Sequence, residues 1–446
     1  MMILAVLVAA QVLTVANTNL IAIALPPLSA ELGATAVQRQ WIVDVYVLVF
    51  AALLVAGGVL ADRYGRRRAL LTGLAVFAAG SVACAVVSDP GLLIAARVLQ
   101  ALGPPLVLPA SLSIVSATFS SPTARAKAIG VWGAGSGFGI AVGPVVGGLI
   151  VAGLGWRWAF GVSALAASLL AVAVAVSIPA DRPPTPSRRF DLRGAVLVTG
   201  AIGGLVFALI EGPSRGWNSA SVVAAFVASG VLAGALVLAE RAHPAPLIDF
   251  ELLRRPKFLA ANLSAATMMF AMLATSVYVS EFLQTFRANS PLDAGLALLP
   301  LGLATAVLAA VSGRLTSHVP ARTQIVLGLL CAGGGALVLS RAGTDRGLVP
   351  ALLLLGAGAG IALPATTATA VSAVAAGRTG MASAIHNASR QVGATLGVAA
   401  LGSIVTTHAA SGRAADYADG LSIALLVAAT ALVACAVLTV RLITRE

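Results

Sequence analysis

Fourteen long apolar stretches run through this chain, and they decide what it can fold into. Hydrophobic residues make up 59% of its 446 residues and charged residues only 10%, whereas a soluble domain carries about a quarter charged residues. A stretch of about 20 apolar residues crosses a bilayer as a helix, because backbone amides in hydrocarbon have to be satisfied within the segment. The sequence therefore predicts an all-α polytopic membrane protein with 14 transmembrane helices. The predicted spans are 3–25, 40–61, 69–88, 91–113, 127–151, 157–179, 194–212, 220–239, 258–282, 292–313, 322–340, 347–371, 380–406 and 420–441.

The basic residues are distributed unevenly between the loops. A net charge of +12 would indicate a nucleic-acid partner in a soluble protein, but here the arginines gather in alternate loops, after the even-numbered spans. The positive-inside rule then places both termini and those loops in the cytoplasm, and no nucleic acid is expected as a partner. The first span lacks a basic leader and is too long for a signal sequence, so we expect a retained helix. Lys127 and Lys257 are the only lysines, whereas arginines are many. This composition fits a bacterium with a GC-rich genome, and we therefore expect the protein in a bacterial plasma membrane.

The sequence carries no pattern of an enzyme or a metal site. The three cysteines, Cys84, Cys331 and Cys435, are far apart and lie inside predicted spans, where cysteine behaves as a small apolar residue. There is no metal-ligand cluster, no nucleophile motif in a suitable context and no phosphate-binding loop. We expect no enzyme activity, no cofactor and no metal.

Two polar linkers divide the chain. The first, 181–193, is rich in proline and arginine and cannot continue a helix; the second is 241–257. They delimit an N-terminal six-helix bundle over 1–180, an inserted helix pair over 194–240, and a C-terminal six-helix bundle over 258–446. The predicted plan is six plus two plus six helices.

A glycine- and arginine-rich turn, Gly58–Arg68, follows the second span. This turn resembles the signature loop of the major facilitator superfamily. Other stretches resemble its fourteen-helix drug:proton antiporter branch, namely Trp41–Tyr46, Gly143–Gly148, Trp156–Phe160, Ser290–Leu296 and Ser389–Gly393. The resemblance runs almost from end to end. It implies the major facilitator fold and proton-coupled export of small amphiphilic drugs or antibiotics by alternating access.

Within the turn, four residues are candidates for a cytoplasmic latch: Gly58, Asp62, Gly65 and Arg66. The glycines permit close approach and a tight turn, and Asp62 is able to pair with Arg66 or with a helix N-terminus. In the family this loop is thought to stabilise the outward-facing state. The alternative interpretation is an ordinary positive-inside turn.

Glycines recur at every fourth position of the fifth span, from Gly135 onward, and make a flat stripe that another helix backbone can approach closely. Pro144 removes a backbone donor in the middle of this stripe. The resemblance implies a hinge and seal between the two halves, and tight helix packing alone is the alternative. The hinge candidates are Gly139, Gly143, Pro144, Gly147 and Gly148.

Ionisable residues inside the spans are costly and are candidates for transport. Asp44 and Arg97 lie near the outer ends of the second and fourth spans, where they would pair or bridge through water, or else snorkel to the interface. The stretch from Arg97 to Gly103 resembles the proton-transfer motif of the family, with Ala101 where glycine is usual. His386 and Arg390 share one face of the thirteenth span; they are candidates either for transport or for a polar packing cluster.

The first span departs from the family pattern. Asn17 stands where the family usually carries an acidic residue, and asparagine forms hydrogen bonds but does not carry a proton. Glu281, near the outer end of the ninth span, is a candidate replacement unless solvent simply surrounds it.

These observations predict a proton-driven exporter whose partners are a small amphiphilic molecule, protons and the lipid bilayer, working as a monomer. Asn17 keeps open an importer or an uncoupled facilitator of a small metabolite. A non-transporting membrane receptor built on a transporter fold is the alternative from a different class.

Overall fold

A computed structural model of the chain describes residues 2–119, 121–179, 192–242, 252, 254–315, 319–374, 379–409 and 412–443. These residues form long helices and no strand. In chain order the helices are α1 (Met2–Leu32), α2 (Ala36–Tyr64), α3 (Arg66–Val86), α4 (Pro90–Ala101), α5 (Pro104–Thr118), α6 (Pro122–Leu154), α7 (Trp156–Ser177), α8 (Leu192–Arg215), α9 (Ala220–Ala242), α11 (Pro256–Phe286), α12 (Pro291–Leu315), α13 (Ala321–Arg346), α14 (Leu348–Ser372), α15 (Thr379–His408) and α16 (Ala414–Leu442).

The predicted all-α membrane fold is confirmed. Thirteen segments of the described chain are long and apolar enough to cross a membrane. α15 is a fourteenth long helix outside that set, and its Asn387, Arg390 and Gln391 lower its hydropathy. One predicted span, 91–113, is two helices: the chain breaks between α4 and α5, because Pro104 and Pro105 have no N–H to continue the hydrogen bonding of α4.

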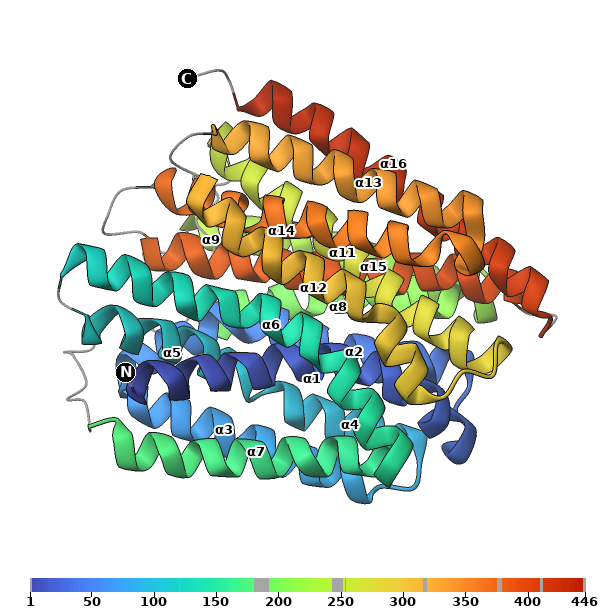
Figure 1. Ribbon diagram of the computed structural model, residues 1–446, viewed down its shortest axis with the longest axis horizontal. Coiled ribbons are helices and arrows are strands. Elements are labelled where there is room, and N and C mark those ends of the chain that lie inside the picture. The colour runs from blue at the N-terminus through green and yellow to red at the C-terminus, as the bar shows by residue number, and fades with distance from the viewer. Residues whose placement is uncertain are drawn as a thin grey trace.

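The helices form two bundles that lie side by side (Figure 1). α1 to α7 make one half and α11 to α16 the other. The halves meet along two seams, one between α6 and α12 and one between α2 and α15, and α1 also contacts α11 between them. At the α6–α12 seam the backbones come close enough that a Cβ on Gly148 would lie 2.7 Å from the carbonyl oxygen of Pro291.

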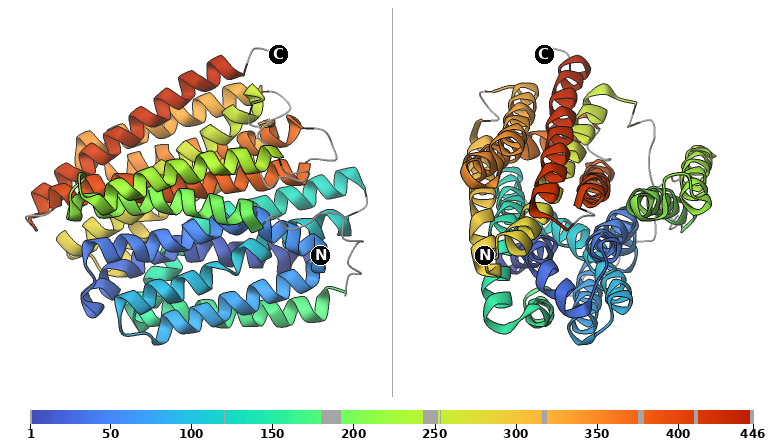
Figure 2. Two further views of the ribbon diagram at one scale, coloured as in Figure 1. Left: turned by 180° about the vertical axis from the view of Figure 1, so that it is seen from behind. Right: turned by 90° about the vertical axis from the view of Figure 1, so that its right-hand side faces the viewer.

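The remaining pair, α8 and α9, stands at one side of the molecule (Figure 2). α8 packs against both α2 and α15, and α9 packs on α8, where Ser229 donates a hydrogen bond of 2.7 Å to the carbonyl of Ala201. The domain boundaries given above stay a prediction, since the linkers 181–193 and 241–257 lie largely outside the described residues.

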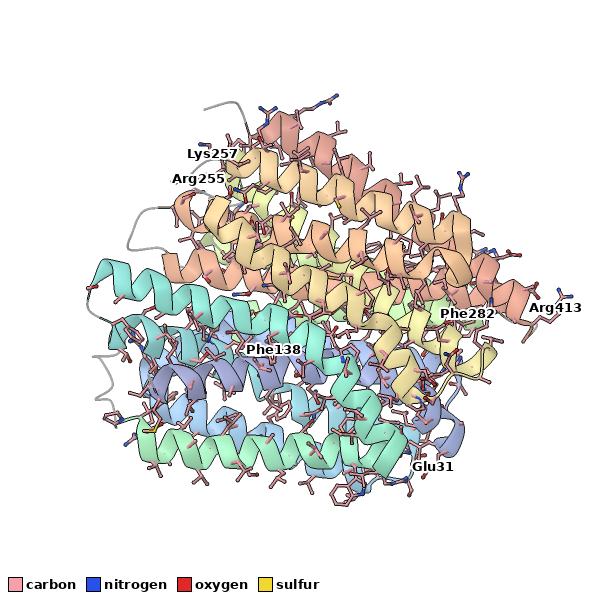
Figure 3. The ribbon with its side chains drawn as sticks, viewed as in Figure 1. Glu31, Phe138, Arg255, Lys257, Phe282 and Arg413 are labelled. Atoms are coloured by element: carbon pink, nitrogen blue, oxygen red, sulfur yellow. The ribbon has the colours of Figure 1, made fainter. Side chains whose placement is uncertain are left out.

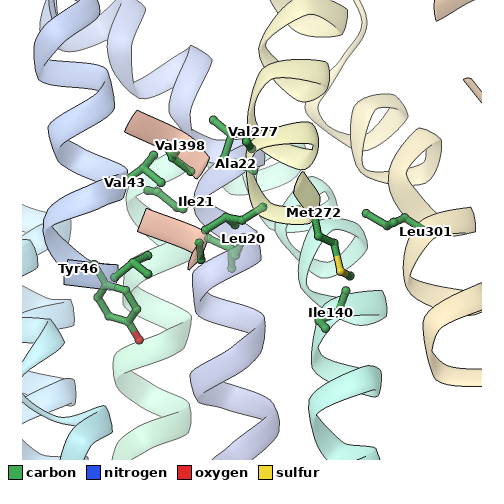
Figure 4. Packing of buried hydrophobic residues seen from close by; sticks show 14 of the residues in the cluster. Leu20, Ile21, Ala22, Val43, Tyr46, Ile140, Met272, Val277, Leu301 and Val398 are labelled. Atoms are coloured by element: carbon green, nitrogen blue, oxygen red, sulfur yellow. The ribbon is translucent and has the colours of Figure 1, made fainter. Parts of the chain in front are cut away.

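The two ends of the molecule differ in how tightly the halves meet. We name them the α1–α2 end, where α1 ends and α2 begins, and the α2–α3 end opposite. Toward the α1–α2 end, every residue of α1 from 19 to 25 and of α11 from 271 to 283 is buried. Side chains of both halves pack against one another at this closure and beside it, among them Leu20, Ile140, Met272 and Leu301 (Figure 4). Toward the α2–α3 end, residues 387–392 of α15 are all partly exposed.

Candidate functional site

Asp44 lies on α2 and is fully buried. Neither of its carboxyl oxygens has a hydrogen-bond partner among the described residues. It stands one turn after Gln40. The side-chain amide of Gln40 and the hydroxyl of Tyr278 both lie against Gly402 of α15, because a Cβ on Gly402 would be within 2.3 Å of each. Asp44 therefore faces the α2–α15 seam. Because an ionised carboxylate left unpaired in the interior costs several kcal/mol, this packing suits the neutral acid.

Arg97 belongs to a different cluster, inside the N-terminal bundle. Its Nε donates to the carbonyl of Ile42 (3.1 Å) and its Nη1 to Gln100 Oε1 (2.6 Å), while its guanidinium lies 4.2 Å from the centre of the Tyr46 ring. Such stacking suits a planar guanidinium. Arg97 is fully buried, and snorkelling to the interface is ruled out in this conformation.

Gln100 connects this cluster to the first helix. Its amide donates to Ser81 (2.8 Å) and to Asn17 Oδ1 (3.4 Å), and Ser163 donates to the same oxygen of Asn17 (3.4 Å). Asn17 thus acts as an acceptor in a network that contains a buried cation. The role in transport predicted for Asn17 and Arg97 stays a prediction.

The expected pairing of Asp44 with Arg97 is wrong for this conformation. Ile42 and Asp44 are two residues apart and so point about 200° apart around α2, while Tyr46 returns to the face of Ile42. Arg97 contacts that face, and Asp44 points away from it toward the seam. The positions of two charged residues in the sequence do not show toward which neighbouring helix each side chain points.

Glu281 joins the two halves at the α1–α2 end. It forms an ion pair of 3.1 Å with Arg39 at the start of α2, and the Tyr417 hydroxyl of α16 donates to it at 3.2 Å. Only 7% of Glu281 is exposed, so it is not simply solvated. Whether it carries a proton in place of the missing acid at Asn17 stays a prediction.

A second inter-half contact uses the consecutive prolines Pro26 and Pro27 inside α1. Because proline has no N–H, the carbonyls four residues earlier lose their helical partners. Those carbonyls, of Ala22 and Ile23, accept hydrogen bonds from α11: Ser280 donates at 2.8 Å and Gln284 at 3.1 Å. The lost hydrogen bonds of one half are thus replaced by the other.

A small pocket lies beside these contacts, with Leu25, Val43, Val277 and Val398 among its lining residues and only about 10 Å³ of space for the centres of water-sized spheres. Sites for drug-sized ligands usually occupy about 300–1,000 Å³. The pocket is therefore too small for the expected cargo, and the α1–α2 end is closed in this structure.

His386 and Arg390 lie toward the α2–α3 end. His386 is 1% exposed; its Nε2 lies 3.2 Å from the Thr367 hydroxyl of α14, and its Nδ1 has no partner. Arg390 is partly exposed, and its Nε also lacks a partner among the described residues. Both interpretations, transport and packing, stay open as predictions.

The latch residues are only partly described. Gly65 has the positive φ of 100° that the tight turn requires, and its N–H donates to the carbonyl of Ala61 (3.1 Å). Arg66 donates to the carbonyl of Ser113 in α5 (3.4 Å). Gly58 makes only an ordinary contact with Pro109; the glycine that meets the α5 backbone is its neighbour Gly57, beside Pro105. The side chain of Asp62 lies outside the described residues, so its role as a latch stays a prediction.

The glycine stripe of α6 faces α1 and not the other half. Cβ atoms built on Gly139, Gly143 and Gly147 would lie about 3 Å from atoms of Val15, Ala16 and Leu20. The contact with the other half is made by Gly148 and by the carbonyl of Pro144, which Gly295 of α12 approaches. The stripe itself therefore packs within its own half, and the hinge role of Gly139, Gly143, Pro144, Gly147 and Gly148 stays a prediction.

Ser280, Gln284 and Tyr417 were missed in the sequence. The proline pair of α1 was a usable signal, because it marks two carbonyls that need donors. Nothing in the sequence marks which helix supplies them.

Comparison with known proteins agrees with this architecture. Residues 7–398 match the family described as the Major Facilitator Superfamily. The chain belongs to the major facilitator superfamily. It is 36% identical to the puromycin resistance protein pur8 of Streptomyces alboniger, over 93% of this chain and 83% of that protein. It is 35% identical to the multidrug resistance protein Stp of Mycobacterium tuberculosis, over 86% of this chain and 72% of that protein.

Solved structures of the superfamily share the fold. A peptide transporter POT superposes with a TM-score of 0.70 at 21% identity, over 99% of this chain and 95% of that chain. A bacterial homologue of the lysosomal transporter Spinster, described as inward-facing and unoccupied, has a TM-score of 0.70 at 16% identity, over 98% of this chain and 95% of that chain. This protein is thus a multi-pass membrane protein of a transporter family, and its relatives are antibiotic and multidrug resistance proteins.

Proposed function

We propose that this protein exports small amphiphilic drugs or antibiotics across a bacterial plasma membrane, by alternating access, in exchange for protons. The names of its relatives support export of such compounds. The mostly apolar interior of the described helices fits an amphiphilic cargo better than a sugar or a polyanion, which needs several convergent polar groups.

Asp44 carries the proposal for proton coupling. With the α1–α2 end closed, both of its oxygens are buried without partners, so the protonated acid stabilises this closure. Loss of the proton leaves a charge that needs water, and opening of the α2–α15 seam supplies it. Protonation therefore favours the closed α1–α2 end, and deprotonation favours its opening.

An antiporter requires protonation to favour closure of the outer end, and this holds if the α1–α2 end faces outward. A proton bound from outside then returns the empty carrier to the inward-facing state. Glu281 has the opposite sign: its ionised form pairs with Arg39 and stabilises closure, so its protonation would favour opening. We assign the coupled proton to Asp44 and a closing contact to Glu281.

The proposed orientation follows from the charges at the two ends. Arg255 and Lys257 lie at the α2–α3 end, opposite Glu31 and Arg413 (Figure 3), and the arginines of the α2–α3 turn share that end. The positive-inside rule puts the α2–α3 end and both termini in the cytoplasm. The six-plus-two-plus-six division and the monomer belong to the same proposal.

The test is accumulation of a panel of antibiotics and dyes in a host that lacks its own efflux pumps, with and without a protonophore. We expect the wild type to lower accumulation of at least one compound, the protonophore to abolish this, and Asp44→Asn to be inactive. Asp62→Asn tests the latch in the same assay. Asp89→Asn is the matched control, because Asp89 caps α4 and asparagine caps equally well. Export by Asp44→Asn at the wild-type level would refute the assignment.

An uncoupled facilitator is the second candidate, and Asn17 favours it. Asn17 accepts hydrogen bonds from Gln100 and Ser163 at the place where the family usually has an acid. Transport that survives collapse of the proton gradient would establish this candidate instead.

A further inference from the structure

α8 lies across the seam that contains Asp44. An apolar cluster joins Val206 and Ile210 of α8 to Val37 and Trp41 of α2, with Leu396 and Ala399 of α15 in the same cluster. The Trp41 and Phe207 rings lie 6.3 Å apart. α8 therefore touches both halves of the protein along a single face.

Asp44 is at the level of these contacts. On α2 it lies between Trp41, which stacks with α8, and Leu48, which is 3.8 Å from the Cβ position of Gly203. Trp41 and Asp44 are three residues apart and so point only about 60° apart around the helix. The carboxyl group is thus next to the face of α2 that α8 covers.

The covering part of α8 holds no charge that could bind Asp44. Residues 202–210 are all apolar or glycine, and the charges that follow, Glu211 and Arg215, pair with each other at 2.6 Å. On its other side α8 is covered by α9, whose Val227 is 60% exposed. The inserted pair thus presents apolar surface to the seam and to the surroundings.

We propose that α8 insulates Asp44: it closes the bilayer-facing side of the α2–α15 seam and keeps water and lipid headgroups from the carboxyl group. This inference rests on the proposed proton coupling through Asp44. With α8 in place, the proton reaches Asp44 only when the halves change conformation. Without a dry cover, water enters beside Trp41, and protons cross without cargo, since a hydrated carboxyl group exchanges protons with both sides.

Val206→Ser tests this insulation in liposomes that contain the purified protein and a pH-sensitive dye. Val206 is fully buried in the apolar cluster, so a hydroxyl there attracts water into the seam. We expect the cargo-independent proton flux under a pH gradient to rise several-fold. Val227→Ser, the same substitution on the exposed face of α9, should leave the flux at the wild-type level.

The double variant Val206→Ser with Asp44→Asn separates insulation from loose packing. If the leak passes through Asp44, the double variant returns to the wild-type baseline. A leak that persists in the double variant would overturn the proposal. The absence of a leak in both folded Val206→Ser and folded Phe207→Ala would also overturn it. Phe207→Ala serves if Val206→Ser does not fold. A wild type without any cargo-dependent proton flux would instead refute the proposed function, so the two failures are distinct.

Discussion

The α1–α2 end and the α2–α3 end are built from the same helices, but they differ in how their polar side chains are hydrogen-bonded. At the α1–α2 end the polar side chains bond across the halves, as Ser280, Gln284 and Glu281 do. At the α2–α3 end, buried polar atoms of Gln11, Asn262, His386 and Arg390 have no partner among the described residues. Buried polar groups are normally paired, but Gln40 and Asp44 also leave buried atoms without partners toward the α1–α2 end. What distinguishes the two ends is therefore the hydrogen bonding across the halves. The difference indicates which end is closed in this conformation.

Gly148→Val should have the largest effect on this comparison, because it separates the halves at the α6–α12 seam. A side chain there meets the backbone of Pro291 and Leu292 within 3 Å, and such overpacking costs about 1–3 kcal/mol or more. We expect export to be lost while the protein still inserts. Gly153→Val is the control on the same helix, since no atom lies within 4 Å of its Cβ position. Equal losses in both variants would mean that the close approach at Gly148 is not required.

The double variant Ser280→Ala with Gln284→Ala should come next. It removes both donors to the carbonyls that Pro26 and Pro27 leave without partners, at about 0.5–1.5 kcal/mol each. We expect the closed α1–α2 end to open more often, measured as faster modification of a cysteine placed there. Ser276→Ala is the control, because Ser276 bonds only within α11. An unchanged rate would show that these bonds do not hold the end closed.

Glu281→Gln should have a smaller effect, on the order of 1 kcal/mol, because Arg39 keeps 29% of its side chain exposed and can turn to water. The closed end should open slightly more often, and proton-driven export should persist. Asp416→Asn, which disturbs the exposed pair with Arg413 at the same end, is the control. Complete loss of proton dependence in Glu281→Gln would make Glu281 the coupled acid and refute our assignment.

Thr367→Val should have the smallest effect on the α1–α2 end. It removes the contact with His386 at the opposite end and should lower the free energy of unfolding by about 1 kcal/mol, measured by thermal denaturation in detergent. The accessibility of the α1–α2 end should not change. A change there would show that the two ends are coupled through α14 and α15.

The helices and the family were predictable from the sequence, and the directions of the side chains were not. Apolar spans such as 258–282 are fixed by length and hydropathy alone. The helices carry apolar residues on all faces, however, because bilayer and core are both apolar. The hydropathy pattern therefore did not indicate that Asp44 points away from Arg97. The stripe from Gly139 to Gly147 predicted a close helix neighbour correctly but did not say that this neighbour is α1.

The central claim is that protonated Asp44 holds the α1–α2 end closed. The most direct test replaces Cys84, Cys331 and Cys435, introduces Val277→Cys in the small pocket at that end, and follows its modification by a polar maleimide as pH rises, corrected for the intrinsic reactivity of the thiol. We expect modification to become faster as Asp44 loses its proton, and to stay slow at every pH when Asp44→Asn is added. Modification that is independent of pH, or equally fast with Asp44→Asn, would contradict the account.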